Sequence, residues 1–338
     1  MDADIALILL QDGVVNGAIY ALLALSLVLV FAVTRVILIP QGEFVAFGAL
    51  TYAALDAGRL PGSVWLLAGL GIAAFVAGSL QERRAWLGLA VETLVLPAVV
   101  IGLAMLLAPL RPGVVVEALL AVAIVTPMAP YLYRVAFQPL AEASVLVLLI
   151  ASVGVHLALN GLGLVFFGPE GFRAQGFSDA RLAVGGLVIP GQALWIVGLT
   201  LLSMAGLALF FGRTLAGKAL RATAVNRLGA RLVGIATSLS GRIAFALAGL
   251  IGAVSGVLIV PLTTVYYDSG FLIGLKGFVA AIIGGLVSYP LAAAAAVLVG
   301  CVESFSSFYA SAFKEVIVFT VIIPVLLWRS LAGAAEEE

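Results

Sequence analysis

Long apolar runs, separated by short polar segments, follow one another along most of the chain. A helix needs about 20 apolar residues to cross a hydrocarbon core of about 30 Å, and the runs reach that length. Membrane β-strands would alternate apolar and polar residues over about ten positions, so these solid runs predict helices instead. The clearest predicted spans are 13–34, 60–80, 143–168, 182–212, 243–267 and 277–302.

Weaker runs contain an ionisable residue, and they raise the expected number of spans to about ten or eleven. These runs are 36–55, 85–110, 114–133 and 315–328. Gly284-Gly285 and Pro290 interrupt the region 270–310, which therefore predicts either short spans or a re-entrant hairpin. The pattern predicts an all-α polytopic transmembrane bundle with broken helices, formed by residues 1–338 as a single domain.

Composition supports a membrane protein and removes several functional classes. The chain is 64% hydrophobic and only 10% charged, whereas an ordinary soluble domain has about 25% charged residues. Its 17 basic and 17 acidic residues cancel, so no charge excess favours binding to nucleic acid. Cys301 and His156 are the only residues of their types, which excludes an intrachain disulfide and multi-histidine metal sites.

Short motifs typical of enzymes are absent from the sequence. There is no GxxxxGK[ST] phosphate loop, HExxH or GxSxG, so the sequence predicts neither an ATPase nor a hydrolase. No cofactor or metal is expected. The acidic N-terminus lacks the positive region of a cleavable signal, so the first span is expected to remain in the mature protein.

The distribution of Lys and Arg predicts how the bundle is oriented. Segment 213–242 has six basic residues and no acidic one, which places it in the cytoplasm by the positive-inside rule. Counting spans backwards puts Arg134 and the pair Arg83/Arg84 inside, with segment 168–183 and the N-terminus outside. The basic residues of the segment are Arg213, Lys218, Arg221, Arg227, Arg231 and Arg242.

Segment 213–242 is also the strongest local signal of an interaction. Lys218 and Arg221 fall on one side of a predicted helix that Gly229 is expected to end or bend. Positive-inside anchoring alone accounts for the charge. It accounts less well for the length, because anchoring needs only a few residues, so the segment favours docking of a cytoplasmic partner.

Ionisable residues within the spans are costly, about 2.5 to 3.5 kcal/mol each at a helix centre. Glu43 follows Pro40-Gln41-Gly42, which predicts a broken helix facing a cavity; an ordinary helix start with Glu43 in its first turn is the alternative. Glu92 and Glu117 are interpreted as helix-end or protonated residues. For His156, a neutral imidazole bonded to a neighbouring helix is favoured over a proton relay.

Two interrupted segments share a short apolar motif. Phe44-Val45-Ala46 follows Gly42-Glu43, and Phe278-Val279-Ala280 follows Lys276-Gly277. Lys276 and Glu303 are further ionisable candidates within the spans. Matching breaks in two halves would indicate a binding site at a repeat interface. Chance similarity between apolar segments is the alternative.

Three stretches of the chain match the order and spacing of a known pattern. They are Asn16-Gly17-Ala18-Ile19-Tyr20-Ala21-Leu22 with Gln41-Gly42-Glu43, Tyr133-Arg134-Val135-Ala136-Phe137-Gln138-Pro139-Leu140, and a stretch running from Gly217-Lys218-Ala219-Leu220-Arg221 through Leu232-Val233-Gly234-Ile235 to Lys276–Gly285 and Glu303. Together these stretches resemble the permease subunits of branched-chain amino acid ABC importers of the LivH type. Segment 60–110 has no clear counterpart in that pattern and is interpreted as an inserted pair of spans. Leu38-Ile39-Pro40-Gln41 also differs from the family's usual Asn-Phe-Ala-His.

The resemblance implies a transport subunit of the bacterial inner membrane with four kinds of partner: two cytoplasmic ATPases, a second homologous permease, a periplasmic solute-binding protein and the lipid bilayer. It implies a substrate pathway at Gln41, Glu43 and Lys276. The expected ATPase contacts are Lys218, Arg221, Arg227 and Arg231, and the expected binding-protein contacts are Glu170, Arg173, Asp179 and Arg181. For the last group, a merely solvated loop is the alternative.

Other classes remain as rivals. An ion-coupled secondary transporter would use Glu43 and His156 as a relay. A channel would need no basic docking segment, and a membrane enzyme is disfavoured by the missing nucleophile and metal motifs.

Overall fold

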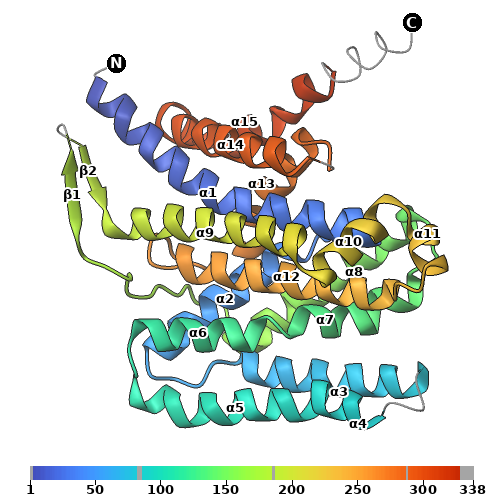
Figure 1. Cartoon of the computed structure of the whole chain (residues 1–338). Coiled ribbons are helices and arrows are strands. Elements are labelled where there is room, and N and C mark those ends of the chain that lie inside the picture. The colour runs from blue at the N-terminus through green and yellow to red at the C-terminus, as the bar shows by residue number, and fades with distance from the viewer. Residues whose placement is uncertain (1–2, 82–85, 185–186, 287, 328–338) are drawn as a thin grey trace, which may run out of the picture.

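The computed structural model describes residues 3–81, 86–184, 187–286 and 288–327, and these residues form a helical bundle with one small hairpin. The predicted all-α polytopic class is confirmed. Strands β1 (Arg181–Val184) and β2 (Leu187–Pro190) pair antiparallel, with Leu182 opposite Ile189. Figure 1 shows the hairpin at one end of the bundle, on the same side as the N-terminus.

Eight helical runs in the described residues are long and apolar enough to cross a membrane. They are α1 (Ala3–Thr34), α3 (Ser63–Gln81), the run from α4 (Trp86–Ala90) through a π-helical turn (Val91–Val95) to α5 (Leu96–Leu107), the run from α6 (Val114–Val125) through α7 (Met128–Leu132) and a second π-helical turn (Tyr133–Phe137), α8 (Val145–Phe167), α9 (Gly191–Arg213), α12 (Thr237–Ile259) and α14 (Tyr289–Tyr309). The shorter helices are α2 (Gln41–Asp56), α10 (Leu215–Val225), α11 (Arg227–Leu232), α13 (Ser269–Ile283) and α15 (Lys314–Thr320). The expected number of about ten or eleven spans therefore depends on whether the shorter apolar segments also cross.

The core lies where α1, α2, α12, α13 and α14 pack together. Small residues bring the backbones close there, among them Gly13 and Gly17, which lie four residues apart on α1. A Cβ on Gly17 would lie 2.6 Å from the Cα of Val297, so α1 and α14 meet at backbone contact. Close approach replaces the hydrophobic driving force that is missing between helices in lipid.

The breaks expected at 40–42 and 284–285 are both present. Residues 35–40 are not helical and α2 begins at Gln41, as the Pro-Gln-Gly pattern predicted. Gly285 and Leu286 have φ values of 74° and 56°, in the left-handed region that glycine tolerates best. The apolar run 277–302 is therefore divided between α13 and α14, at the interruption that Gly284-Gly285 predicted.

Two further boundaries differ from the predictions. The span predicted over 182–212 begins only at Gly191, because the strands pair up to Pro190, which has no N–H to continue a helix. Gly229 does not end the helix that contains Lys218. That helix ends before Asn226, whose side-chain Oδ1 accepts a hydrogen bond from the Gly229 N–H at 2.8 Å and so caps α11.

Segment 60–110 forms an antiparallel pair of long helical runs at one edge of the bundle, α3 and α4–α5 (Figure 1). That it is an insertion stays a prediction. The predicted cytoplasmic pair Arg83/Arg84 lies outside the described residues. So does Trp328, the end of the last predicted span, of which α15 covers the beginning.

Candidate functional site

Two broken segments meet inside the bundle, where the first turns of α2 and α13 cross. A Cβ on Gly42 would lie 1.9 Å from the carbonyl oxygen of Gly270, and a Cβ on Gly274 would lie 2.9 Å from Gly42. Only glycines allow two helix starts to approach so closely. We call this crossing the half-helix junction; it joins parts of the chain that lie more than 200 residues apart in the sequence.

Helix α8 supplies the polar groups that the break requires. Ser152 Oγ accepts a hydrogen bond from the Ile39 N–H at 3.0 Å, and His156 Nδ1 lies 2.6 Å from Glu43 Oε1. Ser152 and His156 are four residues apart, so both face the junction from one side of α8. Freed backbone groups are thus satisfied within the protein, as the apolar surroundings require.

The hydrogen bond expected between His156 and a neighbouring helix is present. Glu43 lies in the first turn of α2, directly after the break, so the broken-helix and helix-start interpretations of this segment are compatible. Ser152 was missed. Its spacing from His156 in an otherwise apolar span was the available signal, because two polar residues at i and i+4 mark one face.

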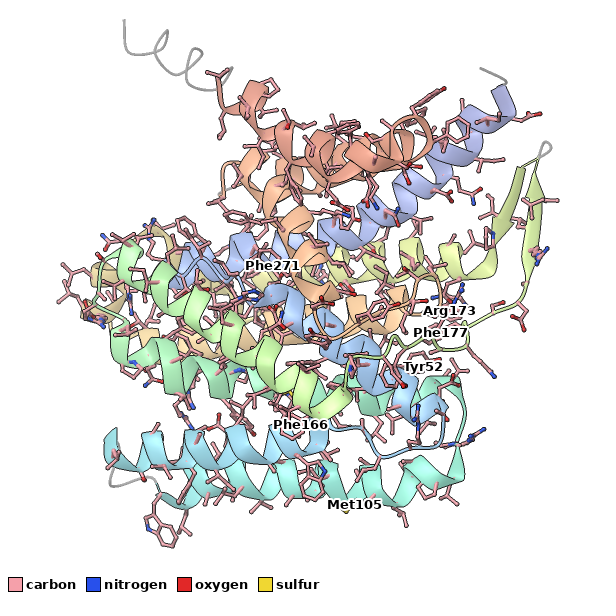
Figure 2. The ribbon with its side chains drawn as sticks, turned by 180° about the vertical axis from the view of Figure 1, so that it is seen from behind. Tyr52, Met105, Phe166, Arg173, Phe177 and Phe271 are labelled. Carbon is pink, nitrogen blue, oxygen red and sulfur yellow. The ribbon has the colours of Figure 1, made fainter. Side chains whose placement is uncertain are left out.

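Open acceptors remain at the junction. Gln41 Nε2 donates to the Ala248 carbonyl at 3.0 Å, but Gln41 Oε1 and Glu43 Oε2 are buried and have no hydrogen-bond partner among the described residues. A small apolar cavity of about 120 Å³ reaches the junction at Gly274, with Ile39 and Phe271 in its wall; Gln41 and Glu43 do not line it. The Phe271 ring also packs on His156, with 4.7 Å between ring centroids; Figure 2 shows Phe271 beside α8.

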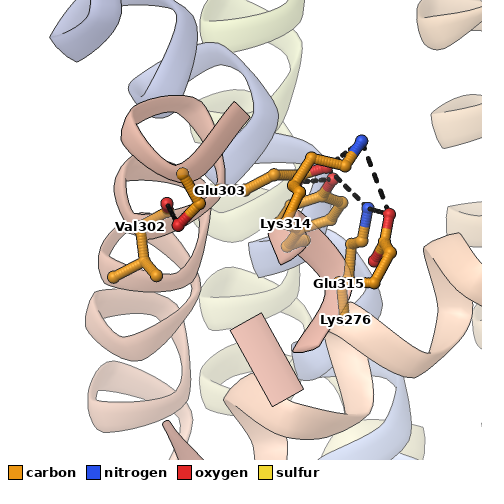
Figure 3. Close-up of polar contacts among 7 residues, drawn as sticks. Lys276, Val302, Glu303, Lys314 and Glu315 are labelled. Carbon is orange, nitrogen blue, oxygen red and sulfur yellow. Dashed lines mark hydrogen bonds and ion pairs between the residues drawn. The ribbon is translucent and has the colours of Figure 1, made fainter. Parts of the chain in front are cut away.

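Lys276 lies midway along α13 and has partners of its own, so it does not join Gln41 and Glu43 at the junction. Its Nζ lies 2.6 Å from Glu303 Oε1 and 3.2 Å from Glu315 Oε1 (Figure 3). The Tyr20 hydroxyl donates to the other oxygen of Glu303. The suggested correspondence between Lys276 and Glu43 is not reflected in their surroundings, since one belongs to an ion network and the other to a carboxylate–imidazole pair.

Glu92 is held by arginines from the rest of the bundle. Its carboxylate lies 3.1 Å from Arg242 and 3.4 Å from Arg134. Glu92 and Arg134 each lie in a π-helical turn. The interpretation of Glu92 as a snorkelling or protonated residue stays a prediction; its half-exposed carboxylate is ion-paired, and these pairs attach the α3–α5 pair to α12. Glu117 does lie at a helix start, where its carboxylate accepts from the Gly113 N–H at 3.4 Å.

The four basic residues expected to contact an ATPase divide into two pairs. Lys218 and Arg221 are exposed on α10, a helix that Thr214 caps by accepting from the Gly217 N–H at 2.9 Å. Arg227 donates to the Ala141 carbonyl at 2.8 Å, and Arg231 lies 2.6 Å from Glu142. The first pair is open to a partner, whereas the second ties the segment to the loop before α8.

Exposed apolar side chains accompany these charges, and the sequence reasoning missed them. Leu215, Val225 and Leu232 are 85%, 86% and 80% exposed. Leu228 and Val233 are exposed as well. They lie in segment 213–242, close in sequence to cationic residues that suit water, so lipid is a poor explanation for them. An apolar patch among positive charges is typical of a docking surface for another protein.

At the opposite end, the loop between α8 and β1 is tied to the bundle. Arg173 donates to the carbonyls of Pro261 and Leu262 at 3.3 and 3.4 Å, and Tyr52 donates to the Gln175 carbonyl at 3.0 Å. Figure 2 shows Tyr52, Arg173 and Phe177 together. Glu170, Asp179 and Arg181 are exposed. The inner part of this loop is therefore bonded to the bundle and is not freely solvated, whereas its charged side chains are exposed.

Comparison with known proteins identifies the family of the chain. The family model described as branched-chain amino acid transport system / permease component matches residues 9–326. The chain is 26% identical over 334 residues to the high-affinity branched-chain amino acid transport system permease protein LivH of Escherichia coli, covering 94% of this chain and 91% of the relative. It is 31% identical over 214 residues to the corresponding protein BraD of Pseudomonas aeruginosa, covering 61% and 70%.

No solved structure gives a significant match to the chain. Among the described residues, no group of three or more His, Cys, Asp or Glu side chains is placed to hold a metal ion. The family match extends over nearly all of the helical bundle, including the half-helix junction and the basic segment. This chain is a multi-pass membrane protein that belongs to the permease family of branched-chain amino acid transport systems.

Proposed function

We propose that the chain is the membrane-spanning permease subunit of an ATP-binding-cassette importer that moves branched-chain or related small apolar amino acids across the bacterial inner membrane. The observation that carries the proposal is the surface of α10, where Lys218 and Arg221 are exposed beside apolar residues. The sequence contains no phosphate loop, so nucleotide hydrolysis would take place in partner subunits.

The partners that follow are two cytoplasmic ATPases, a second homologous permease and a periplasmic solute-binding protein. The ATPases would dock on α10 and α11 at the basic end of the bundle. The binding protein would meet the opposite end, where Glu170, Asp179 and Arg181 are exposed and Arg173 braces the loop.

A displacement of α10 could be transmitted into the bundle through a hydrogen bond and an ion pair. Thr223 on α10 donates to Ser240 on α12 at 3.2 Å, and Arg231 pairs with Glu142 before α8. Helix α12 packs on both α1 and α2, and α8 is bonded to the start of α2. Closure of the ATPases would therefore bias the bundle between two arrangements, because both α12 and α8 are bonded to the half-helix junction.

The substrate pathway is proposed to pass the half-helix junction. Gln41 and Glu43 offer unsatisfied acceptors there, and an apolar cavity of about 120 Å³ reaches the same junction at Gly274. An ammonium group and a small apolar side chain would suit such surroundings. Lys276, the third pathway residue expected from the family resemblance, would act separately, in the ion network beside Glu303.

Charge reversal tests the docking surface. The double variant Lys218→Glu, Arg221→Glu should lose most co-purification with the ATPase subunits and most ATP-driven uptake of L-leucine, since like charges would face the partner's acidic contacts. Arg181→Glu, an exposed reversal at the other end, should keep ATPase co-purification. Unchanged association and uptake in the double variant would contradict the proposal.

The paired side chains of Glu43 and His156 favour a second candidate, an ion-coupled secondary transporter. A buried carboxylate 2.6 Å from an imidazole can hold or release a proton. That function predicts uptake that persists when ATP is depleted and stops when the ion gradient collapses. The importer predicts the reverse.

A further inference from the structure

A second cavity, which is polar, lies away from the half-helix junction, between α1, α14 and the start of α15. It is a cleft of about 530 Å³, within the range of about 300–1,000 Å³ typical of small-molecule sites. Asp12 and Glu303 line it, together with Lys314. Figure 3 shows Glu303 and Lys314 beside Lys276, which forms the buried floor of the network.

The cleft continues toward the outer end of the bundle. A neighbouring hollow of about 330 Å³ shares Gln11, Asp12 and Pro190 with it and reaches Val188 of β2. Figure 1 places β2 and the N-terminal part of α1 at the end of the bundle opposite α10 and α11. A ligand delivered at the end that carries the hairpin would meet this groove first.

The charged side chains of the cleft differ in how closely they are paired with other charges. Lys276 is 5% exposed and holds Glu303 at 2.6 Å, whereas Lys314 lies 3.6 Å from Glu303 and 3.4 Å from Glu315. The Lys314 contacts are too long for strong hydrogen bonds, so its ammonium still has donors to give. On the other wall, Asp12 is exposed and has no ion-pair partner among the residues that the structure describes.

Neutral and apolar groups complete the lining. Asn16 and Ser307 also line the cleft and can add hydrogen bonds, and Gln11 Oε1 is buried with no hydrogen-bond partner in the part of the chain that the structure describes. Leu9, Val15, Ala193, Leu262 and Phe308 provide an apolar wall.

We propose that this cleft is an entry site for the zwitterionic amino acid. The α-carboxylate pairs with Lys314, the α-ammonium pairs with Asp12, and the side chain lies against the apolar wall. The inference rests on the proposed function, which supplies the substrate class. A ligand with only one charge leaves either Asp12 or Lys314 without a ligand partner, so the site discriminates against simple amines and simple carboxylates.

Binding of tritiated L-leucine to the full-length chain in lipid nanodiscs tests the site. We expect Asp12→Asn and Lys314→Gln each to raise the dissociation constant about tenfold to a hundredfold, because each removes a charge-assisted hydrogen bond. Isopentylamine and 4-methylpentanoate, which each lack one charged group of leucine, should compete poorly. Asp268→Asn, an exposed carboxylate that does not line the cleft, is the control and should bind as the unaltered chain does.

Conservative variants separate binding from folding. Asp12→Glu and Lys314→Arg keep the charges and should restore most of the affinity lost in Asp12→Asn and Lys314→Gln. The inference is overturned if the unaltered chain does not bind L-leucine, if the neutral variants bind it equally well, or if isopentylamine competes as well as leucine.

Uptake measurements distinguish this failure from failure of the proposed function. ATP-driven L-leucine uptake by vesicles that hold the unaltered chain and its partners tests the importer alone. If uptake is normal and the neutral variants bind L-leucine as well as the unaltered chain does, only the entry site is ruled out. If ATP-driven uptake is absent, the importer function is ruled out.

Discussion

Two groups of buried ionisable residues lie on opposite sides of α13, and they are stabilised in different ways. At the half-helix junction, Glu43 is 1% exposed and relies on one hydrogen bond to His156. At the cleft, Glu303 is 7% exposed and lies among two lysines and a tyrosine hydroxyl. The junction has glycine-to-glycine backbone contact, whereas the network borders a cleft.

The comparison teaches how an apolar bundle tolerates charge. In the network, opposite charges alternate and offset one another's desolvation, so each ion depends on its neighbours. At the junction the carboxylate depends on geometry, because α8 must present Ser152 and His156 to a break in another helix. The network is therefore expected to be sensitive to charge, and the junction to shape.

The largest expected effect comes from adding a methyl group at the junction. Gly42→Ala places a Cβ 1.9 Å from the Gly270 carbonyl oxygen, and neither backbone can move without separating α2 from α13. We expect a loss of more than about 3 kcal/mol in the free energy of unfolding, measured in mixed detergent.

Gly154→Ala is the matched control, since a Cβ there meets nothing within 4 Å on α8. It should be neutral or slightly stabilising, because alanine favours the helix. Equal stability of the Gly42→Ala and Gly154→Ala variants would show that the junction is not a tight backbone contact.

A smaller effect is expected from removing the central charge of the network. Glu303→Gln leaves Lys276 buried with Glu315 as its remaining anion, at 3.2 Å. Because the amide still accepts a hydrogen bond, we expect a loss of about 2 kcal/mol in the same unfolding measurement, below the cost of a wholly unpaired buried charge. A stability equal to that of the unaltered chain would mean that the ion pairs add nothing.

The smallest effect is expected from the same substitution at the junction. Glu43→Gln keeps the shape of the side chain, and its amide can still bond to His156 Nδ1, so the free energy of unfolding should change by less than about 1 kcal/mol. This result, set beside that for Glu303→Gln, sharpens the contrast between shape and charge. A larger loss from Glu43→Gln than from Glu303→Gln would reverse it.

Much of the fold follows from local patterns. The apolar runs predict the spanning helices, and Pro40-Gln41-Gly42 and Gly284-Gly285 predict two breaks that are present, because proline lacks an N–H and adjacent glycines favour a local turn. The hairpin was missed, since Leu182 and Ile189 are as apolar as the helix they precede and the strand pairing depends on a partner segment.

The candidate sites were only partly predictable. Lys218 and Arg221 stand out by charge, and Glu43 by its place after a break. The separation of Lys276 from Glu43 was not foreseen, and neither were the exposed apolar residues of the basic segment. A short shared motif suggests similar surroundings, but side-chain partners are chosen by the packing of distant helices.

The amino-acid sequence alone determined that the chain is a helical membrane bundle, where two of its helices are broken and which segment is basic, because hydropathy, proline, glycine and charge act over a few residues. Only the tertiary structure decided that the starts of α2 and α13 cross, that α8 satisfies the first break, and that Lys276 pairs with Glu303. Those pairings join residues far apart in the chain, and in a bundle of similarly apolar helices only close packing and unmet hydrogen bonds select which helices become neighbours.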